Sequence, residues 1–433
     1  MPFAAFDLHK KMIQAATFDD LGNVLHRERF PATRPAIEAF AEKHLTPQHK
    51  VALEATFNTW EIVAILQPLV AEVVVSNPLQ TRAIAQAKVK TDKIDTDVLG
   101  HLLRCDYLPK VWIPTPEIRQ LRHECTERAN LTQDRTRIKN RIHAVLHQRL
   151  IEAPHADLFS PQALAWLRTL PLDSPGRKTL DRYLRQLDAI EHEILAVGDD
   201  LARHAYATPQ VKLLMTIPGV DFAVAESLYS TLGDLSRFPT PDEAASYLGL
   251  VPSTYQSAET GYHGRITKRG RAHARWLLVQ AAQHLDRHPG PLGVFFRRLA
   301  HKKNRNIAVV ATARKLVTIS WHMLKNNEPY RYALPKASKA KFDRLRIRAT
   351  GKRRKGGNAK GSGRPAAYGS GKPTRGVPSL DQVYEDAQVP SLPPAAPGEK
   401  RMLAGQGLVE FAGEIRKPHR VPKNVGGRKP KTA

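Results

Sequence analysis

Short apolar runs and polar turns alternate over the first hundred residues. The runs "FAAFDL", "MIQAATFD" and "VLHRERF" between residues 3 and 30 predict three strands, and a turn at residues 20–23 separates the last two. Further on, the pattern predicts a helix at 35–44, the buried strand "KVALEAT", the helix "TWEIVAILQPLV" and the strand "AEVVVSNP". A final helix carries "KTDKIDTDVLGHLLRC". The resulting order, β-β-β-α-β-α-β-α, predicts a mixed α/β layer fold over residues 1–110.

Helical spacing of three and four residues replaces this pattern from about residue 116. Two apolar stripes follow that spacing and comprise Ile118, Leu121, Cys125, Ile138, Ile142 and Val145, then Tyr183, Leu187, Ile190, Ile194, Val197 and Leu201. They predict a long helical arm with coiled-coil character over residues 111–205. The arm either packs on itself as a hairpin or acts as a dimerisation element. A second, mostly helical domain is expected over residues 206–330.

The last hundred residues have a different composition. Residues 336–375 contain 14 Lys or Arg and one acid, Asp343, with few apolar side chains. A segment of this kind buries too little apolar surface to offset the conformational entropy lost on folding. We therefore expect residues 331–433 to form a disordered basic tail that binds polyanions.

Charge and composition narrow the class of protein. The 433 residues carry a formal net charge of +26 and a pI near 10.1, which predicts a polyanionic partner, nucleic acid before an anionic membrane surface. The chain has no run of 18 apolar residues and no signal-peptide pattern at its start, so we expect a cytoplasmic protein. Cys105 and Cys125 alone cannot form a disulfide framework or a zinc site. His143 and His147 have a spacing that suits zinc, but without an evident third ligand we interpret them as helix-surface residues.

Four acidic residues of this basic chain are candidate metal ligands. Asp7 lies in the first strand, Glu54 lies at the end of a later strand, and Asp92 and Asp95 are three residues apart on one helix face. Asp97 lies about 200° from Asp95 at helical pitch and points elsewhere. Clustered carboxylates repel one another unless cations neutralise them, and oxygen ligands suit Mg²⁺. The pattern predicts a Mg²⁺ site for phosphodiester chemistry, and the alternative is a set of ordinary surface and helix-terminal acids.

Taken in order, these motifs resemble a known family, the DEDD transposases of bacterial insertion sequences, family one hundred and ten. The first domain is similar to a RuvC-like (RNase H-like) nuclease domain in "FDLHKKMI", "ALEATFNTW" and "KTDKIDTDVL", which carry Asp7, Glu54, Asp92 and Asp95. The second domain resembles the transposase domain of that family from "LLMTIPGVDF" to "RITKRGRAHARWLL". The resemblance covers roughly residues 3–325 and leaves the tail outside.

The resemblance implies a composite phosphoryl-transfer chemistry. In proteins of this family the carboxylates bind Mg²⁺, and a serine of the second domain attacks a DNA phosphate to form a covalent phosphoserine. A noncoding bridge RNA encoded by the element pairs with donor and target DNA, and the proteins assemble as tetramers. The resemblance therefore implies that this chain is a DNA transposase and recombinase that binds DNA and RNA as a dimer or tetramer.

The serine of the family maps to Ser257 in "QSAET". Ala258 stands where the family has a glycine-type residue, which leaves Ser253 as the alternative nucleophile. The basic segment "RITKRGRAHAR" follows and could contact phosphate or stabilise its developing charge. The candidate contacts are Arg265, Lys268, Arg269, Arg271 and Arg275, and a solvated basic face is the alternative for some of them.

The segment "TIPGVDFAVA" resembles a helix-hairpin-helix turn, a module whose backbone amides hold a DNA phosphate. Asp221 stands where such turns often have a second glycine, and its carboxylate would oppose a phosphate. A purely structural turn between two helices is therefore the alternative.

Two further functions remain open for the whole chain. A RuvC-like nuclease would cleave DNA with metal-activated water and would form no protein–DNA bond. A nucleic-acid-binding scaffold would keep the basic surface without chemistry. The intact set of four acids favours an enzyme over the scaffold.

Overall fold

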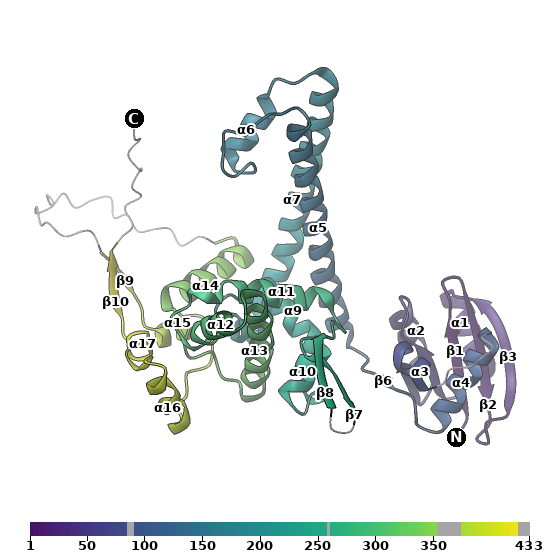
Figure 1. Ribbon diagram of the computed structural model, residues 1–433. Helices are drawn as coiled ribbons and strands as arrows, with labels where there is room; N and C mark the ends of the chain where they lie inside the picture. The colour runs from purple at the N-terminus through teal and green to yellow at the C-terminus, as the bar shows by residue number, and fades with distance from the viewer. Residues whose placement is uncertain (85–90, 258–259, 353–373, 423–433) are drawn as a thin grey trace, which may run out of the picture. The chain divides into compact units, whose positions relative to one another are not determined.

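The computed structural model of the chain describes residues 1–84, 91–257, 260–352 and 374–422. The chain forms two compact units, Met1–Thr115 and Pro116–Ala433 (Figure 1). The boundary between them falls five residues after the end predicted for the first domain, at residue 110.

A mixed sheet forms the centre of the first unit. Its order in the described residues is β3-β2-β1-β4-β5-β6. The strand β1 pairs antiparallel with β2 and parallel with β4, while β3 and β6 are antiparallel edge strands. The strands are β1 (Phe3–Leu8), β2 (Met12–Phe18), β3 (Val24–Pro31), β4 (Lys50–Glu54), β5 (Glu72–Ser76) and β6 (Lys110–Val111).

Helices cover both faces of this sheet. The helices are α1 (Arg34–His44), α2 (Thr59–Leu66), α3 (Pro78–Ile84) and α4 (Asp92–Arg104). One face packs against apolar residues of α1 and α2, and the other face packs against Leu99 and Leu103 of α4. A Cβ atom on Gly100 would overlap the ring of Phe18 in β2, so the close approach of α4 to the sheet requires glycine.

The predicted β-β-β-α-β-α-β-α order is confirmed over this unit. Two elements, α3 and β6, were not expected from the sequence. The strand β6 has two residues and exists through its pairing with β5, so its local pattern carries little signal.

Two long helices, α5 (Pro116–His147) and α7 (Ser174–Ala207), lie side by side in the second unit, with α6 (Pro161–Thr169) near one end (Figure 1). Their apolar stripes face each other, with Ile142 and Leu187 in one cluster and Leu121 and Leu201 in another. The arm therefore packs on itself as a hairpin. Its other end packs on α9 and α14, which makes it part of the same unit as the domain that follows.

The remainder of the second unit is mostly helical. Its elements up to residue 326 are α8 (Pro209–Met215), α9 (Phe222–Leu232), α10 (Pro241–Tyr247), β7 (Pro252–Ser257), β8 (Thr260–Ile266), α11 (Ala272–Gln283), α12 (Pro291–Lys302) and α13 (Arg305–Asn326). Among the described residues, α13 alone is long and apolar enough to cross a membrane, yet half of its most apolar window is buried inside this unit. The helix packs on α10, α11 and α12, as the central helix of a core does.

The prediction of a disordered tail is wrong for residues 335–352 and 374–422. These residues form α14 (Pro335–Thr350), β9 (Thr374–Val377), α15 (Leu380–Asp386), α16 (Pro397–Gly405), α17 (Val409–Glu414) and β10 (His419–Pro422). Leu345, Leu380 and Tyr384 are buried in the main core, and the Tyr384 hydroxyl donates to the carbonyl oxygen of Tyr330 at 2.7 Å. A few apolar side chains suffice because the rest of the domain already offers a core to cover. The predicted tail residues 353–373 and 423–433 lie outside the described residues.

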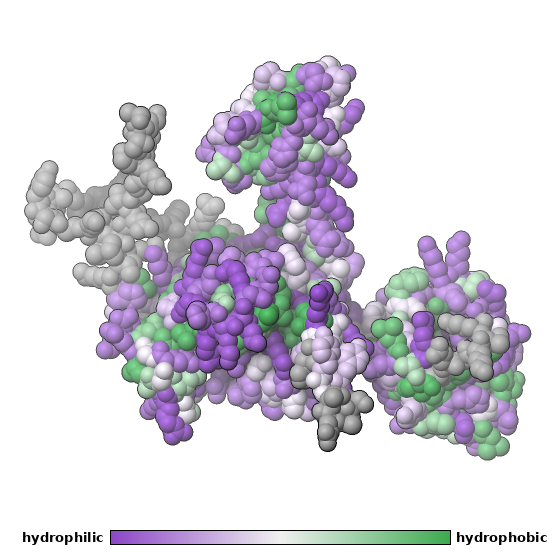
Figure 2. Space-filling model, in the orientation of Figure 1, coloured by the Kyte–Doolittle hydropathy of each residue, from purple (hydrophilic) through white to green (hydrophobic). Residues whose placement is uncertain are grey.

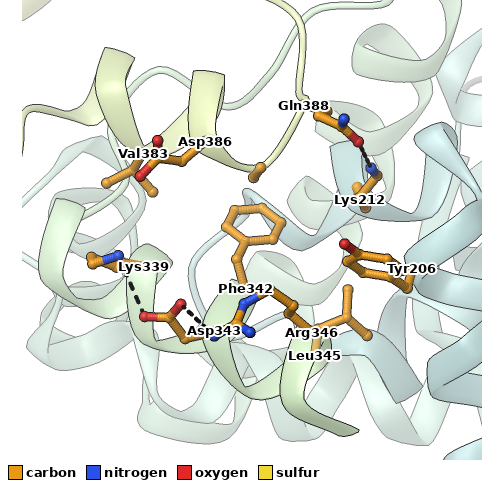
Figure 3. Close-up of a pocket in the computed structure, with 11 residues that line it drawn as sticks. Tyr206, Lys212, Lys339, Phe342, Asp343, Leu345, Arg346, Val383, Asp386 and Gln388 are labelled. Atoms are coloured by element: carbon orange, nitrogen blue, oxygen red, sulfur yellow. Dashed lines mark hydrogen bonds and ion pairs between the residues drawn. The ribbon is translucent and has the colours of Figure 1, made fainter. Parts of the chain in front are cut away.

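A small pocket of about 150 Å³ marks the junction of α14, α15 and the base of the arm (Figure 3). Asp343 contacts Lys339 at 3.4 Å and Arg346 at 3.6 Å, and Lys212 donates to Gln388. The hydrogen bond between Lys212 and Gln388 therefore links the C-terminal segment to α8 beside this pocket.

Candidate metal centre and nucleic-acid interface

Asp7 and Glu54 come from neighbouring parallel strands and face the same side of the sheet. Along β1 and β4, Ala5 and Ala52 pack toward α4. Side chains alternate along a strand, so Asp7 and Glu54, each two residues further on, face that side as well. Parallel pairing brings both carboxylates to the same edge of the sheet, at the carboxyl ends of their strands.

The first turn of α4 carries Asp92 and Asp95. The side-chain oxygen of Thr91 caps this helix by accepting a backbone N–H at 3.3 Å. Acids in a first turn are stabilised by the helix dipole, so these two have a structural as well as a chemical explanation. Asp97 forms an ion pair with Arg27 at 2.7 Å, which agrees with its expected direction away from Asp95.

His9 lies between two of these carboxylates. Its Nε2 atom is 3.2 Å from Oδ2 of Asp7 and 3.3 Å from Oδ2 of Asp92. The potential ligand atoms of the three side chains all lie within 4.8 Å of one another. The Asp7 side chain is only 14% exposed, whereas those of His9 and Asp92 are 45% and 43% exposed. The cluster is therefore anchored inside the fold and open to solvent on one side.

The carboxylates of this cluster repel one another, and a bound cation would relieve that repulsion. Burial raises the pKa of Asp7, the charges of Asp95 and Asp92 raise it further, and His9 lowers it. Asp95 is thus close enough to Asp7 to repel its charge. The buried Oδ2 atom of Asp7 has no hydrogen-bond donor of acceptable geometry among the described residues, although His9 lies near it.

The donor set fits a divalent cation. Carboxylate oxygens suit Mg²⁺, and an added imidazole nitrogen suits Mn²⁺ or Zn²⁺ as well. His9 can act in either of two ways: as a metal ligand, or as a protonated ring that neutralises Asp7 and Asp92. The residue was missed at the level of the sequence. The available signal was its position two residues after Asp7 in "FDLHKK", which places both side chains on one face.

The predicted nucleophile lies on a hairpin of the second unit. The strands β7 and β8 pair antiparallel, and Ser257 is opposite Thr260 at the described end of the ladder. Tyr255 and Tyr262 are directly opposite one another, and their side chains are 70% and 67% exposed. Ser253 lies on the same strand, and its hydroxyl donates to the carbonyl oxygen of Arg265 at 3.2 Å.

The five predicted basic contacts separate into two groups. Arg265, Lys268 and Arg269 are exposed on and after β8. Burial lowers the pKa of both Arg271 and Arg275. The Arg275 guanidinium donates to the carbonyl oxygens of Leu248 and Arg269, at 3.0 and 2.9 Å, and so holds the local backbone.

A second group of exposed basic residues lies at the C-terminal end of α12 and was not singled out from the sequence. Figure 2 shows hydrophilic side chains gathered over this helix. The group comprises Arg298, His301, Lys302 and Lys303. Both basic groups belong to the second unit.

The segment "TIPGVDFAVA" forms the turn between α8 and α9. Ile217 and Val220 are fully buried, and a Cβ atom on Gly219 would lie 2.7 Å from the carbonyl oxygen of Ala281. The Asp221 side chain caps α9 by accepting the N–H of Val224 at 3.0 Å. These contacts favour the structural interpretation of the turn over contact with DNA.

Comparisons with known proteins agree with this architecture. Residues 4–150 match a family model for DEDD-type IS110 transposases, described as "Transposase". Residues 211–294 match the "Transposase IS116/IS110/IS902 family". The first match covers the α/β unit with its carboxylates and continues through α5, and the second runs from α8 to the start of α12 and includes the β7–β8 hairpin. Together they place the chain among the DEDD transposases.

Individual relatives support the same assignment. The transposase for insertion sequence element IS1111A of Coxiella burnetii is 30% identical over 47% of this chain and 58% of its own length. The transposase for element IS1328 of Yersinia enterocolitica is 25% identical over 73% of this chain and 94% of its own length. A pilin gene-inverting protein of Moraxella lacunata is 24% identical over 60% of this chain and 74% of its own length. The chain belongs to the IS110 family of insertion-sequence transposases.

The extent of these matches varies. For three of the relatives, the chain spans 58%, 48% and 63% of their length, which is about half to two thirds.

Proposed function

We propose that the chain is a DNA transposase and recombinase that cuts and rejoins DNA with Mg²⁺-binding carboxylates and a serine nucleophile. The observation that carries the proposal is the meeting of Asp7, His9 and Asp92 around one point, with Asp95 beside them. The strand order is β3-β2-β1-β4-β5, in which β1, β2 and β3 pair antiparallel and β1, β4 and β5 pair parallel. This topology supports an RNase H-like (RuvC-like) domain. The names of the relatives, transposases and a gene-inverting protein, support DNA as the substrate.

The roles of the residues follow from their positions. Asp7, Glu54, Asp92 and Asp95 would hold the cation, with His9 as a further ligand or as a positively charged neighbour of Asp7 and Asp92. Bound there, a divalent cation would neutralise phosphate charge and polarise the reacting phosphodiester. The Ser257 oxygen would form a bond to phosphorus while the bond from phosphorus to a deoxyribose oxygen breaks, which leaves a DNA hydroxyl end and a phosphoserine.

The exposed basic residues would hold nucleic acid. Arg265, Lys268 and Arg269 lie on or just after the hairpin of Ser257, so they are placed to contact the same phosphate backbone. Arg275 donates to backbone carbonyl oxygens and Arg271 is partly buried, so these two would stabilise the segment rather than contact DNA. An element-encoded bridge RNA as guide and assembly into a dimer or tetramer complete the proposal.

Covalent trapping tests the nucleophile. The protein is mixed with labelled DNA carrying both element ends, and the products are resolved on denaturing gels. The wild type should give a DNA-linked protein band that Ser257→Ala abolishes and Ser253→Ala retains. Loss of the band with Ser253→Ala alone would move the nucleophile to Ser253. DNA cleavage without any linked protein would favour a water-using nuclease.

Paired carboxylate variants test the metal site. Asp92→Asn and Asp95→Asn should each lower metal-dependent recombination by about 100-fold or more, in the range expected when an essential catalytic group is removed. Asp97→Asn is the matched control on the same helix, because Asp97 pairs with Arg27. Equal activity of Asp92→Asn and Asp97→Asn would contradict the assignment.

A further inference from the structure

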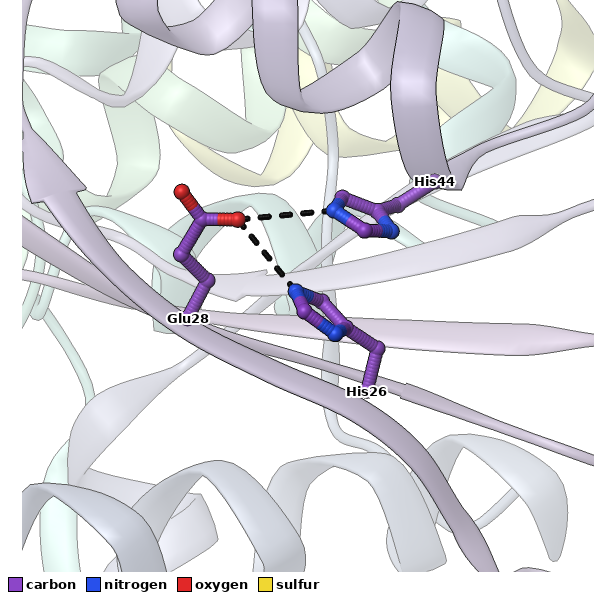
Figure 4. A group of neighbouring side chains, drawn as sticks. All are labelled: His26, Glu28 and His44. Atoms are coloured by element: carbon purple, nitrogen blue, oxygen red, sulfur yellow. Dashed lines mark hydrogen bonds and ion pairs between the residues drawn. The ribbon is translucent and has the colours of Figure 1, made fainter.

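A second group of potential metal ligands lies at the edge of the sheet. His26 and Glu28 are two residues apart on β3, and His44 is the last residue of α1 (Figure 4). The Oε2 atom of Glu28 is 3.2 Å from Nε2 of His26 and 3.4 Å from Nε2 of His44. Figure 4 shows both imidazole rings directed at this one carboxylate oxygen.

These separations match those around a bound transition metal. Zinc binds imidazole nitrogen and carboxylate oxygen at about 2.0–2.2 Å, so two ligand atoms in a tetrahedral shell lie about 3.3 Å apart. The 3.2 Å and 3.4 Å contacts to Glu28 agree with that value, and the potential ligand atoms of all three side chains lie within 4.8 Å of one another. Two His and one Glu also form a ligand set that zinc proteins use.

The surroundings hold the three side chains in place. The carbonyl oxygen of Glu28 accepts a hydrogen bond from the Gln14 side chain at 3.1 Å, which fixes the backbone of β3. The ring of Phe40 lies 5.0 Å from that of His44 and covers it from the core side. The side chain of His44 is 13% exposed, and its Nε2 atom is buried without a hydrogen-bond partner of good geometry among the described residues. A buried, weakly satisfied nitrogen is costly unless it has a partner such as a metal ion.

The imidazole rings of His26 and His44 also contact each other directly. The rings of His26 and His44 are stacked, with their centroids 3.7 Å apart and their planes 14° from parallel.

We infer that His26, Glu28 and His44 form a site for a divalent transition-metal ion such as Zn²⁺, separate from the carboxylate cluster of Asp7. The lone pairs of parallel rings do not converge, so binding requires the two rings to tilt out of their stack. The exposed side of the cluster leaves the fourth position to water. Because the ligands come from β3 and from the end of α1, the ion would fasten this helix to the edge strand.

Zinc titration of the full-length protein, after treatment with a chelator, tests this site. Binding of Zn²⁺ is measured by calorimetry, and Co²⁺ absorption reports whether histidine nitrogen enters the shell. The wild type should bind, and Zn²⁺ should raise the thermal midpoint. His44→Ala and the near-isosteric Glu28→Gln should weaken the affinity by about tenfold or more, in the range seen when metal-site partners are changed.

Two control variants separate this site from other possible ones. Asp92→Asn removes a ligand from the carboxylate cluster, and His143→Ala removes one of the paired histidines on α5. His143→Ala should keep the zinc affinity of the wild type, and Asp92→Asn should lose only the zinc bound at the carboxylate cluster, so that the site of Glu28 still binds. Equal affinity in Glu28→Gln and wild type, or loss of binding in Asp92→Asn with retention in Glu28→Gln, would overturn the inference. Circular dichroism of each variant shows whether a loss reflects unfolding, and Glu28→Gln decides the case if His44→Ala does not fold.

Discussion

Lys341 Nζ donates a hydrogen bond to the carbonyl oxygen of Ile217 at a distance of 2.8 Å. It also donates to the carbonyl oxygens of Val220, at 3.0 Å, and of Met215. Lys341 belongs to α14, whereas the three carbonyls belong to the end of α8 and the turn before α9. A helix from the basic C-terminal segment thus closes a buried turn that is more than 120 residues away in the sequence.

Removing this ammonium should destabilise the second unit. Lys341→Met removes the side-chain donor from three carbonyl oxygens, although that of Ile217 still accepts the N–H of Val220, and we expect a loss of about 2 kcal/mol in the free energy of unfolding. Lys339→Met is the control on the same helix, because its partly exposed pair with Asp343 should contribute less than about 1 kcal/mol. Urea unfolding followed by circular dichroism measures both, and equal losses would contradict the role of Lys341.

Replacing Asp7 should stabilise the metal-free protein and at the same time prevent metal binding. Burial and the neighbouring carboxylates raise the pKa of Asp7 in the folded protein. A raised carboxyl pKa contributes stability at low pH that is lost as pH rises through the folded pKa, so at neutral pH the ionised group destabilises the metal-free protein. Asp7→Asn should therefore raise the thermal midpoint without metal and abolish the increase that Mg²⁺ or Mn²⁺ gives the wild type. Differential scanning calorimetry with and without metal measures both effects, and a lower midpoint in the metal-free variant would refute the first.

His288 should make the second unit sensitive to acid. Burial, together with the charges of Arg297 and Lys341, lowers its pKa from 6.5 to about 4. Its Nδ1 atom accepts the N–H of Gly290 at 3.1 Å, which requires an unprotonated nitrogen. The unfolded chain binds a proton near pH 6.5 and the folded chain only near pH 4, so stability is lost as pH falls across this window. The full loss amounts to about 3 kcal/mol at about 1.36 kcal/mol per pKa unit.

Denaturant unfolding at several pH values checks this dependence. His288→Asn keeps an acceptor for Gly290 but does not titrate, so its stability should change less between pH 6.5 and pH 4. His284→Asn replaces a nearby exposed histidine and should keep the pH dependence of the wild type. The same slope in all three proteins would exclude His288 as the cause.

The exposed basic residues after β7 should set the salt dependence of nucleic-acid binding. Replacement of Arg265, Lys268 and Arg269 by alanine should reduce the slope of log K against log salt by about 0.9 for each duplex phosphate that the variant no longer neutralises. Arg275→Ala should instead lower stability and leave the slope unchanged, because this guanidinium bonds backbone carbonyls. Fluorescence anisotropy at several salt concentrations measures the slopes. An unchanged slope in the triple variant would place the interface elsewhere, with the basic residues of α12 as the next candidates.

The spacing of apolar residues along the chain was enough to predict many of the strands and helices of this protein. Alternation of apolar residues predicted the first strands, and three- and four-residue spacing predicted the paired stripes of α5 and α7, because both periods follow from backbone geometry. Helical pitch separated Asp97 from Asp95, and Asp97 pairs with Arg27.

Only the tertiary structure decided which distant groups meet. His9 joins Asp7 and Asp92, and His44 reaches Glu28, because strand pairing and helix packing bring together residues that have no common local pattern. The partial burial of Arg271 and Arg275 could not be read from a basic run in which Arg265, Lys268 and Arg269 are exposed. Composition predicted disorder beyond residue 331, yet helices form there because the rest of the domain supplies a core that these residues cover. A segment's own sequence records its propensity, whereas its burial depends on the surface that the remainder of the chain presents to it.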